Sequence, residues 1–255
     1  MATYKKRGGK PTTKAEKETQ LEENSTTAEV FNTLDEGASK TEAWVEKNQK
    51  GILGFIIVVA VLALGYFAYD QYIKTPKEAE AMNEMFQAQS YWEQALTAPA
   101  KDSLYNLSLQ GGEGKYGFLE IIENYSGTNA ANLAHYYAGM AYLNTNKYQD
   151  AIAHLDKFSS DDDVLAPLAK GAIGDAFVQL GQNEDALKYY EEAASMRTND
   201  FTTPRFLLKA GIAAMSLSQN DKALAHFKKI ADEYPKSTEA TKAEIYTGRA
   251  EAMNK

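Results

Sequence analysis

Tyr136-Tyr-Ala-Gly-Met-Ala-Tyr142 is an alanine- and glycine-rich segment that returns in altered form as Ala172-Ile-Gly-Asp-Ala-Phe177 and as Lys209-Ala-Gly-Ile-Ala-Ala214. The glycines at 139, 174 and 211 are 35 and 37 residues apart. A second element follows each copy, and the three read Ala151-Ile-Ala-His-Leu155, Ala186-Leu-Lys-Tyr-Tyr190 and Ala223-Leu-Ala-His-Phe227. A period of this length is typical of a helical hairpin that stacks on copies of itself.

These copies resemble the tetratricopeptide repeat, which has a small residue at its eighth position, alanine at the twentieth and a large residue at the twenty-fourth. Turn sequences occupy equivalent places, at Asn144-Thr-Asn-Lys147, Gly181-Gln-Asn183 and Ser218-Gln-Asn-Asp221. Two departures are Ala214, where an aromatic residue is expected, and the proline of the thirty-second position, which survives only as Pro235. The resemblance implies an all-α solenoid of tetratricopeptide-like hairpins, because small residues allow the two helices to approach closely.

The expected repeat domain covers residues 77–255, with repeats at 132–166, 167–203 and 204–237 and a solvating cap at 238–253. A degenerate repeat is expected at 77–129. Its first helix is Lys77–Leu96, with a predicted buried stripe of Ala81, Met85, Ala88, Trp92 and Leu96. Proline, serine, asparagine and glycine predict a loop over Pro99–Gly114, and a helix resumes at Lys115–Tyr125.

An uncharged run, Gly51-Ile-Leu-Gly-Phe-Ile-Ile-Val-Val-Ala-Val-Leu-Ala-Leu-Gly-Tyr-Phe-Ala-Tyr69, precedes the repeats. As a helix it extends about 28 Å, which is enough to cross the hydrocarbon layer of a membrane. We predict a transmembrane helix at 51–73. The anchoring side chains are Ile52, Leu53, Phe55, Ile56, Ile57, Val58, Val59, Val61, Leu62 and Leu64.

A cleaved signal peptide is the alternative, since Ala63-Leu-Gly65 fits a small-x-small cleavage site. The roughly fifty residues before the run are far more than a normal signal sequence carries there, which favours an uncleaved anchor. Residues 28–50 predict a juxtamembrane amphipathic helix that includes Trp44, and residues 1–27 read as a disordered, charged tail.

Charge on either side of the run predicts its orientation. Lys40, Lys47 and Lys50 precede it and Lys74 and Lys77 follow it, and the basic tail tips the balance toward a cytoplasmic N-terminus. The helix is therefore expected to cross the membrane once and to place the C-terminal domain outside the cytoplasm, in the periplasm if the cell has two membranes.

Composition excludes several classes of partner and site. The formal net charge is -8, and the first fifty residues carry equal numbers of basic and acidic side chains, so the excess acid lies in the C-terminal part. A domain with excess negative charge is not expected to bind nucleic acid, because the phosphate backbone repels it. Cysteine is absent, which removes disulfides, iron–sulfur clusters and thiolate zinc sites.

No segment predicts catalysis, so the chain is expected not to be an enzyme and to hold no cofactor or metal. Gly112-Glu-Gly-Lys-Tyr-Gly117 has dinucleotide-binding spacing but no strand before it, and it is interpreted as a flexible loop. His154 and His226 are too far apart to share a metal, and they are interpreted as surface or packing residues. Asp161-Asp-Asp163 predicts a solvated turn with a helix N-cap.

In tetratricopeptide arrays the first helix of each hairpin lines the concave face, so the resemblance nominates a protein-binding groove. Its predicted lining is Leu133, Tyr136, Met140 and Leu143, then Leu168, Gly171, Asp175 and Val178, then Arg205, Leu208, Ile212 and Met215. An apolar groove with methionines suits hydrophobic segments or an amphipathic partner helix. The alternative is that these side chains pack against neighbouring helices or against the N-terminal segment of the chain.

The charged tail, the segment Trp44–Lys50 before one uncleaved span, and the acidic repeat array together resemble the YfgM-like family of bacterial ancillary SecYEG translocon subunits. That resemblance implies partnership with the SecYEG translocon, with emerging secretory polypeptides and with a membrane-anchored periplasmic chaperone. It implies a location in the bacterial inner membrane, with the C-terminal domain in the periplasm, and assistance in protein translocation across that lipid bilayer. The alternative function is an envelope scaffold that assembles cell-wall or division machinery.

Overall fold

The computed structural model describes the backbone of residues 26–99 and 101–254, and side chains from residue 41 onward. The chain divides into two compact units, residues 1–69 and residues 70–255, which are described separately. The first unit contains helix α2 (Thr26–Tyr69), which spans the predicted juxtamembrane helix and most of the predicted span without a break. Of the predicted tail, residues 1–25 lie outside the described residues.

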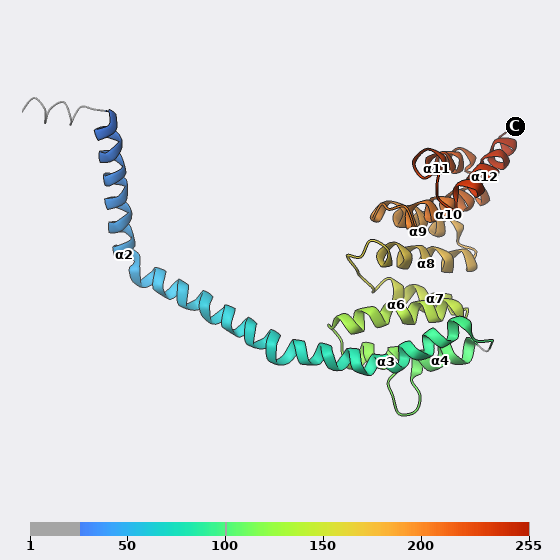
Figure 1. Ribbon diagram of the computed structural model, residues 1–255, viewed down its shortest axis with the longest axis horizontal. Coiled ribbons are helices and arrows are strands. Elements are labelled where there is room, and N and C mark those ends of the chain that lie inside the picture. Colours follow the sequence, from blue (N-terminus) through green and yellow to red (C-terminus); the bar gives the residue numbers. More distant parts are fainter. Residues whose placement is uncertain (1–25, 100, 255) are drawn as a thin grey trace, which may run out of the picture. The chain divides into compact units, whose positions relative to one another are not determined.

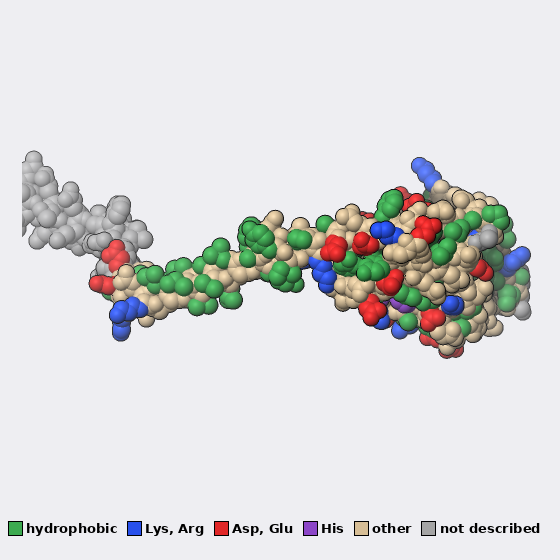
Figure 2. All heavy atoms as spheres, turned by 90° about the horizontal axis from the view of Figure 1, so that it is seen from below, with side chains coloured by type: hydrophobic (Ala, Val, Ile, Leu, Met, Phe, Trp, Pro, Cys, Tyr) green, Lys and Arg blue, Asp and Glu red, His purple; other side chains and the backbone are tan. Residues whose placement is uncertain are grey.

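Exposed apolar side chains follow one another along the C-terminal half of α2, and Figure 2 shows them on the face in view. Phe55, Leu62 and Leu64 are 71%, 67% and 68% exposed. Within the described residues one helical stretch, Thr41–Thr97, is long and apolar enough to cross a membrane, judged by length and composition alone. Its most apolar window has a mean hydropathy of 2.6, and no part of that window is buried.

The second unit begins with a π-helical turn, η1 (Asp70–Lys74), and helix α3 (Thr75–Thr97), which carries Pro76 in its first turn. The buried stripe of α3 consists of Ala81, Met85, Ala88, Tyr91 and Ala95. The predicted stripe is wrong at Leu96, which is 50% exposed, whereas Trp92 is half-buried and packs against the core cluster. Tyr91 and Ala95, which were not predicted, are buried beside it.

The predicted loop over 99–114 is also wrong in part, because it contains helix α4 (Lys101–Gln110). Tyr105 and Leu109 are buried four residues apart, and this apolar pair secures α4 against the core. Helix α5 (Phe118–Asn124) follows, beginning three residues later than predicted. Gly111 and Gly114 take positive φ in the tight turn between the two helices, where an antiparallel bridge joins Gly112 and Lys115.

Three helical hairpins follow and stack in chain order, as Figure 1 shows. They are α6 (Asn129–Asn144) with α7 (Tyr148–Leu155), α8 (Leu165–Gln179) with α9 (Asn183–Met196), and α10 (Thr202–Ser216) with α11 (Asn220–Glu233). Each hairpin turns at a residue with positive φ, at equivalent positions of the repeat: Asn146, Gly181 and Ser218. All the regular secondary structure of the described residues is thus helical, in a repeat-like arrangement, and these residues form no strand.

A glycine in the first helix of each hairpin touches a large side chain of the second. A β-carbon built on Gly139 would lie 2.5 Å from the side chain of Leu155, and one on Gly174 would lie 2.6 Å from the ring of Tyr190. At Gly211 the distance to the ring of Phe227 would be 2.2 Å. Only glycine fits these positions while the large side chain keeps its place.

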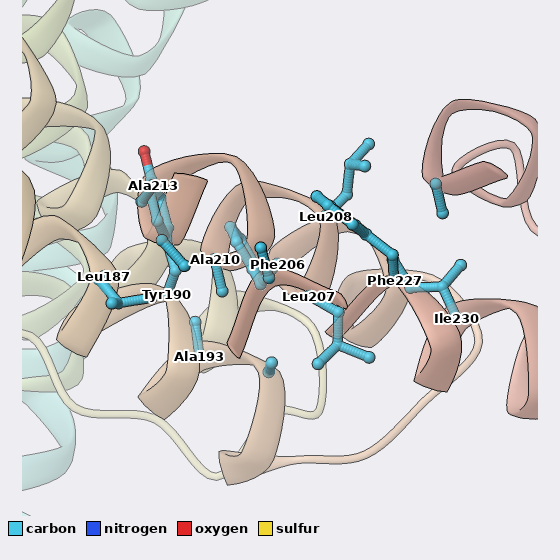
Figure 3. Close-up of a cluster of buried hydrophobic side chains, with 14 of the residues drawn as sticks. Leu187, Tyr190, Ala193, Phe206, Leu207, Leu208, Ala210, Ala213, Phe227 and Ile230 are labelled. Atoms are coloured by element: carbon cyan, nitrogen blue, oxygen red, sulfur yellow. The ribbon is translucent and has the colours of Figure 1, made fainter. Parts of the chain in front are cut away.

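The last helix, α12 (Ala240–Met253), packs on α11 and α10. Its Ala243 and Ala250 join the largest core cluster, which Figure 3 shows between α9, α10 and α11. The ring of Phe227 stacks on Tyr246 of α12 at 5.7 Å. Gly248 of α12 differs from the three repeat glycines, because it is exposed and nothing lies within 4 Å of a β-carbon built on it.

Gly211→Ala and Gly248→Ala are expected to change stability in opposite directions. At Gly211 the added methyl group collides with a buried ring, and overpacking of this kind costs about 1–3 kcal/mol. At Gly248 the methyl group meets open space, so the higher helix propensity of alanine stabilises the fold by about 0.5–1 kcal/mol. Chemical denaturation of the two purified variants, followed by circular dichroism, measures both. Equal effects would contradict the role of Gly211 as a packing contact.

Candidate protein-binding face

Most of the predicted groove residues contact neighbouring helices. Tyr136 is 8% exposed and forms a core cluster with Leu155 and Ile173, so it links the first hairpin to α8. Several other groove positions are half-buried and pack against core clusters: Leu133, Met140, Leu143, Leu168 and Met215. Leu208 is 7% exposed. These side chains therefore help to hold successive hairpins together.

Gly171 has a packing role as well. A β-carbon built on it would lie within 2 Å of the ring of Phe206, because α8 and α10 approach closely there. The position predicted to face a partner is thus covered by the next hairpin.

Three predicted groove residues remain exposed on the first helices of their hairpins. Val178 of α8 is 39% exposed and Ile212 of α10 is 38% exposed, and Arg205 at the start of α10 is also exposed. Since α8 and α10 are in contact, these residues lie on adjacent helices. The accessible part of the predicted groove therefore combines two apolar side chains with one cation, and its binding of a partner stays a prediction.

Asp175, the acidic residue of the predicted groove, is held by an ion pair. Its carboxylate accepts hydrogen bonds from Nζ of Lys209 at 2.5 and 2.7 Å and from the hydroxyl of Tyr190 at 2.6 Å. Burial, together with the neighbouring carboxylate, raises the pKa of Tyr190 above its ordinary value, so its hydroxyl keeps its proton and donates. This network joins α8, α9 and α10 and leaves Asp175 little capacity to bind a ligand.

A polar pocket of about 930 Å³ lies elsewhere, between the end of α5, the start of α6 and the segment after α7. The start of α6 would attract an anion if its N–H groups were unpaired. They are paired, because Glu78 accepts from the N–H groups of Asn129 and Ala130 at 2.7 and 2.8 Å. Thr128 accepts from the N–H of Ala131 at 3.0 Å. The pocket therefore offers no N-terminal anion site.

A histidine pair borders this pocket and was not predicted. Nδ1 of His135 lies 3.1 Å from Nδ1 of His154, so that one ring donates a hydrogen bond to the other. Burial, followed by the charges of His154 and Lys157, lowers the pKa of His135 to about 4. Burial and Lys157 also lower the pKa of His154, against a smaller opposite effect of Asp150. The pair is therefore neutral at physiological pH and joins α6 to α7.

Stability should decrease as the pH falls from about 6.5 toward 4. The folded-state pKa of His135 is lower than that of the unfolded chain, so the unfolded state binds more protons in this window. His135→Leu, which places the residue of the equivalent position 207 in the first hairpin, should remove part of this dependence. Urea denaturation at pH 7.5 and pH 5.5 measures it in both proteins, and an identical loss of stability in the two would argue against the histidine pair.

The other sequence motifs are structural. Asp162 accepts hydrogen bonds from the N–H groups of Val164 and Leu165 at 2.8 and 2.7 Å, and these bonds lower the pKa of its carboxyl at the start of α8. His226 pairs with Glu191, its Nε2 lying 2.9 Å from the carboxylate. Across the residues whose placement is described, no group of three or more histidine, aspartate or glutamate side chains is arranged to hold a metal ion.

Comparison with known proteins gives one family. The family model described as "T7SS, ESX-1 secretion system protein EccA1, N-terminal domain" matches residues 59–244, which is 186 of the 255 residues. No curated protein matches the chain. The matched residues include the last part of the apolar run, all three hairpins and the first part of α12.

This match corrects three predictions made from the sequence. The resemblance to YfgM-like ancillary SecYEG subunits is wrong, because the family that matches is a different one. The match also contradicts the predicted function, which was assistance of the Sec translocon with handover to periplasmic chaperones. The scaffold alternative is contradicted by the same match. The predicted partners are also wrong, since the family points to type VII secretion rather than to SecYEG.

Proposed function

Because this chain belongs to the family of the EccA1 N-terminal domain of the ESX-1 type VII secretion system, we propose that it is a protein-binding repeat module of a type VII secretion machinery. The observation that carries the proposal is the family match across residues 59–244, which includes every hairpin of the second unit. Stacked helical hairpins support it, because such arrays present long continuous surfaces to other proteins. The partners are components or substrates of that machinery.

The exposed part of the first helices is the proposed contact surface. Val178 and Ile212 supply apolar area that water would leave on binding, and each is more than a third exposed. Arg205 adds a cation that pairs with a carboxylate of the partner. A helix or extended segment with apolar residues and an acidic flank meets both requirements.

We further assign membrane attachment to α2. Its support is the exposure of apolar side chains on all faces, which is costly in water and favourable in lipid. The family match begins at residue 59, so residues 51–58 of the apolar run lie outside it, and the anchor is argued from its own composition. The proposed orientation keeps the N-terminus in the cytoplasm, and a non-enzymatic role stays a prediction.

Ile212→Glu and Val178→Glu should each reduce the yield of type VII secretion components that co-purify with the detergent-solubilised chain. A buried charge without a partner opposes association, and the expected loss is at least tenfold. Mass spectrometry with isotope labels measures the recovered components. Ala225→Glu places the same charge on an exposed position of α11 and serves as the control.

The two groove variants must melt at the temperature of the parent protein for the comparison to hold. Recovery of the same components by parent, groove variants and control would refute the proposed contact surface. Recovery of proteins unrelated to type VII secretion alone would refute the proposed function.

Alkaline extraction should leave the full chain in the membrane pellet. Replacing Val58 and Leu62 together by aspartate should release it, because two charges near the centre of the span raise its insertion free energy by about 5 kcal/mol or more. Immunoblotting of pellet and supernatant measures the change. Complete release of the parent protein by alkali would exclude the anchor.

A further inference from the structure

The histidine pair of the first hairpin joins two helices through nitrogen atoms of a kind that metal ions bind. His135 lies in the middle of α6, and His154 lies in the last turn of α7. Their Nδ1 atoms are 3.1 Å apart, and their ring centroids are 5.1 Å apart. A hydrogen bond between two neutral imidazoles accounts for this contact. The same two nitrogens can also bind one cation together.

The separation of the two Nδ1 atoms fits one tetrahedral metal ion. Zinc binds an imidazole nitrogen at about 2.0–2.1 Å, so two histidine nitrogens on one zinc ion are about 3.3 Å apart. If each bond points along its ring, the ring centroids are about 5.2 Å apart. Both distances differ from those in the structure by a few tenths of an ångström or less. A small rotation about χ2 of each histidine, a soft torsion, would therefore admit the ion without moving α6 or α7.

Water can reach the pair and fill the other coordination positions of an ion. His135 lines the polar pocket of about 930 Å³. Within the part of the chain that the structure describes, neither Nε2 atom has a hydrogen-bond partner and neither is fully buried, so both rings meet solvent on their outer side. The pocket thus gives an ion a route to the two Nδ1 atoms and supplies its remaining ligands.

Two exposed charges act on the pair in opposite directions. Asp150, one turn before His154 on α7, favours positive charge on that ring, and Lys157 disfavours it on both rings. Because both side chains are exposed, water screens their effect on a bound ion. The donor atoms are therefore decisive. Two imidazole nitrogens suit zinc, nickel or copper, whereas magnesium and calcium prefer oxygen ligands.

We propose that His135 and His154 together bind one divalent ion of the zinc, nickel and copper class through their Nδ1 atoms. Two protein ligands are fewer than a structural zinc site has, so the site stays open to water and exchanges its ion. Both rings are neutral before and after binding. The ring that donates the hydrogen bond moves its proton from Nδ1 to Nε2 through solvent, so no net proton is released. The site goes beyond the proposed role in secretion and does not depend on it.

Isothermal titration of the detergent-solubilised full chain with Zn²⁺ tests the proposal, with the protein purified on a tag free of histidine. We expect one Zn²⁺ per chain with a micromolar dissociation constant. His135→Leu and His154→Leu should each weaken binding at least tenfold, because each leaves a single imidazole. His226→Gln removes the third and last histidine of the chain, which pairs with Glu191, and should leave the affinity unchanged.

A second measurement needs no substitution. In the chain labelled with ¹⁵N-histidine, one ring of the pair carries its proton on Nδ1 before Zn²⁺ is added, and afterwards both rings should carry it on Nε2. The ¹⁵N chemical shifts distinguish these tautomers, and three histidines give few signals to assign. Zn²⁺ should also raise the melting temperature of the parent chain and of His226→Gln, because the ion binds the folded state, and should not raise that of His135→Leu.

Three results would overturn the proposal. The first is no saturable binding at millimolar Zn²⁺, and the second is undiminished binding by a chain in which both His135 and His154 are replaced by leucine. The third is a zinc-bound chain whose His135 and His154 nitrogens keep the chemical shifts of the free protein. None of these measurements involves secretion, so failure of the metal site is separable from failure of the proposed function.

Discussion

The array depends on the contact between a glycine and a large side chain inside each hairpin. Gly139, Gly174 and Gly211 leave room for Leu155, Tyr190 and Phe227, and the ring or branched chain then fills the space that the missing β-carbon leaves. Because the contact recurs with a fixed separation, each hairpin has nearly the same internal geometry. Hairpins of equal geometry can stack indefinitely, which is why a short local rule determines the architecture of the second unit.

Stacking uses most of the large side chains that were expected to face a partner. Tyr136 and Leu208 are buried against neighbouring helices, and Asp175 is neutralised by Lys209 within the array. The constraint that builds the fold thus competes with binding for the same positions. The proposed contact surface is therefore restricted to residues that packing leaves exposed, such as Ile212.

Repeat spacing predicted the three hairpins and their turns, since periodicity of small and large residues reports packing directly. Composition was a poorer guide to residues 99–114, where α4 forms because Tyr105 and Leu109 are buried together despite the surrounding proline and glycine. The histidine pair was missed because it joins residues nineteen positions apart on two helices, which no local pattern reveals.

The error in the predicted family has the same physical origin as the success in the predicted fold. Residues such as Gly174 and Tyr190 are required by any array of such hairpins, so they identify the packing rule and say nothing of the partner. An apolar helix before the array is equally general, because the hydrocarbon layer requires only length and apolarity. Two general features combined remain general, and only a comparison over residues 59–244 as a whole separates a type VII secretion domain from a Sec subunit.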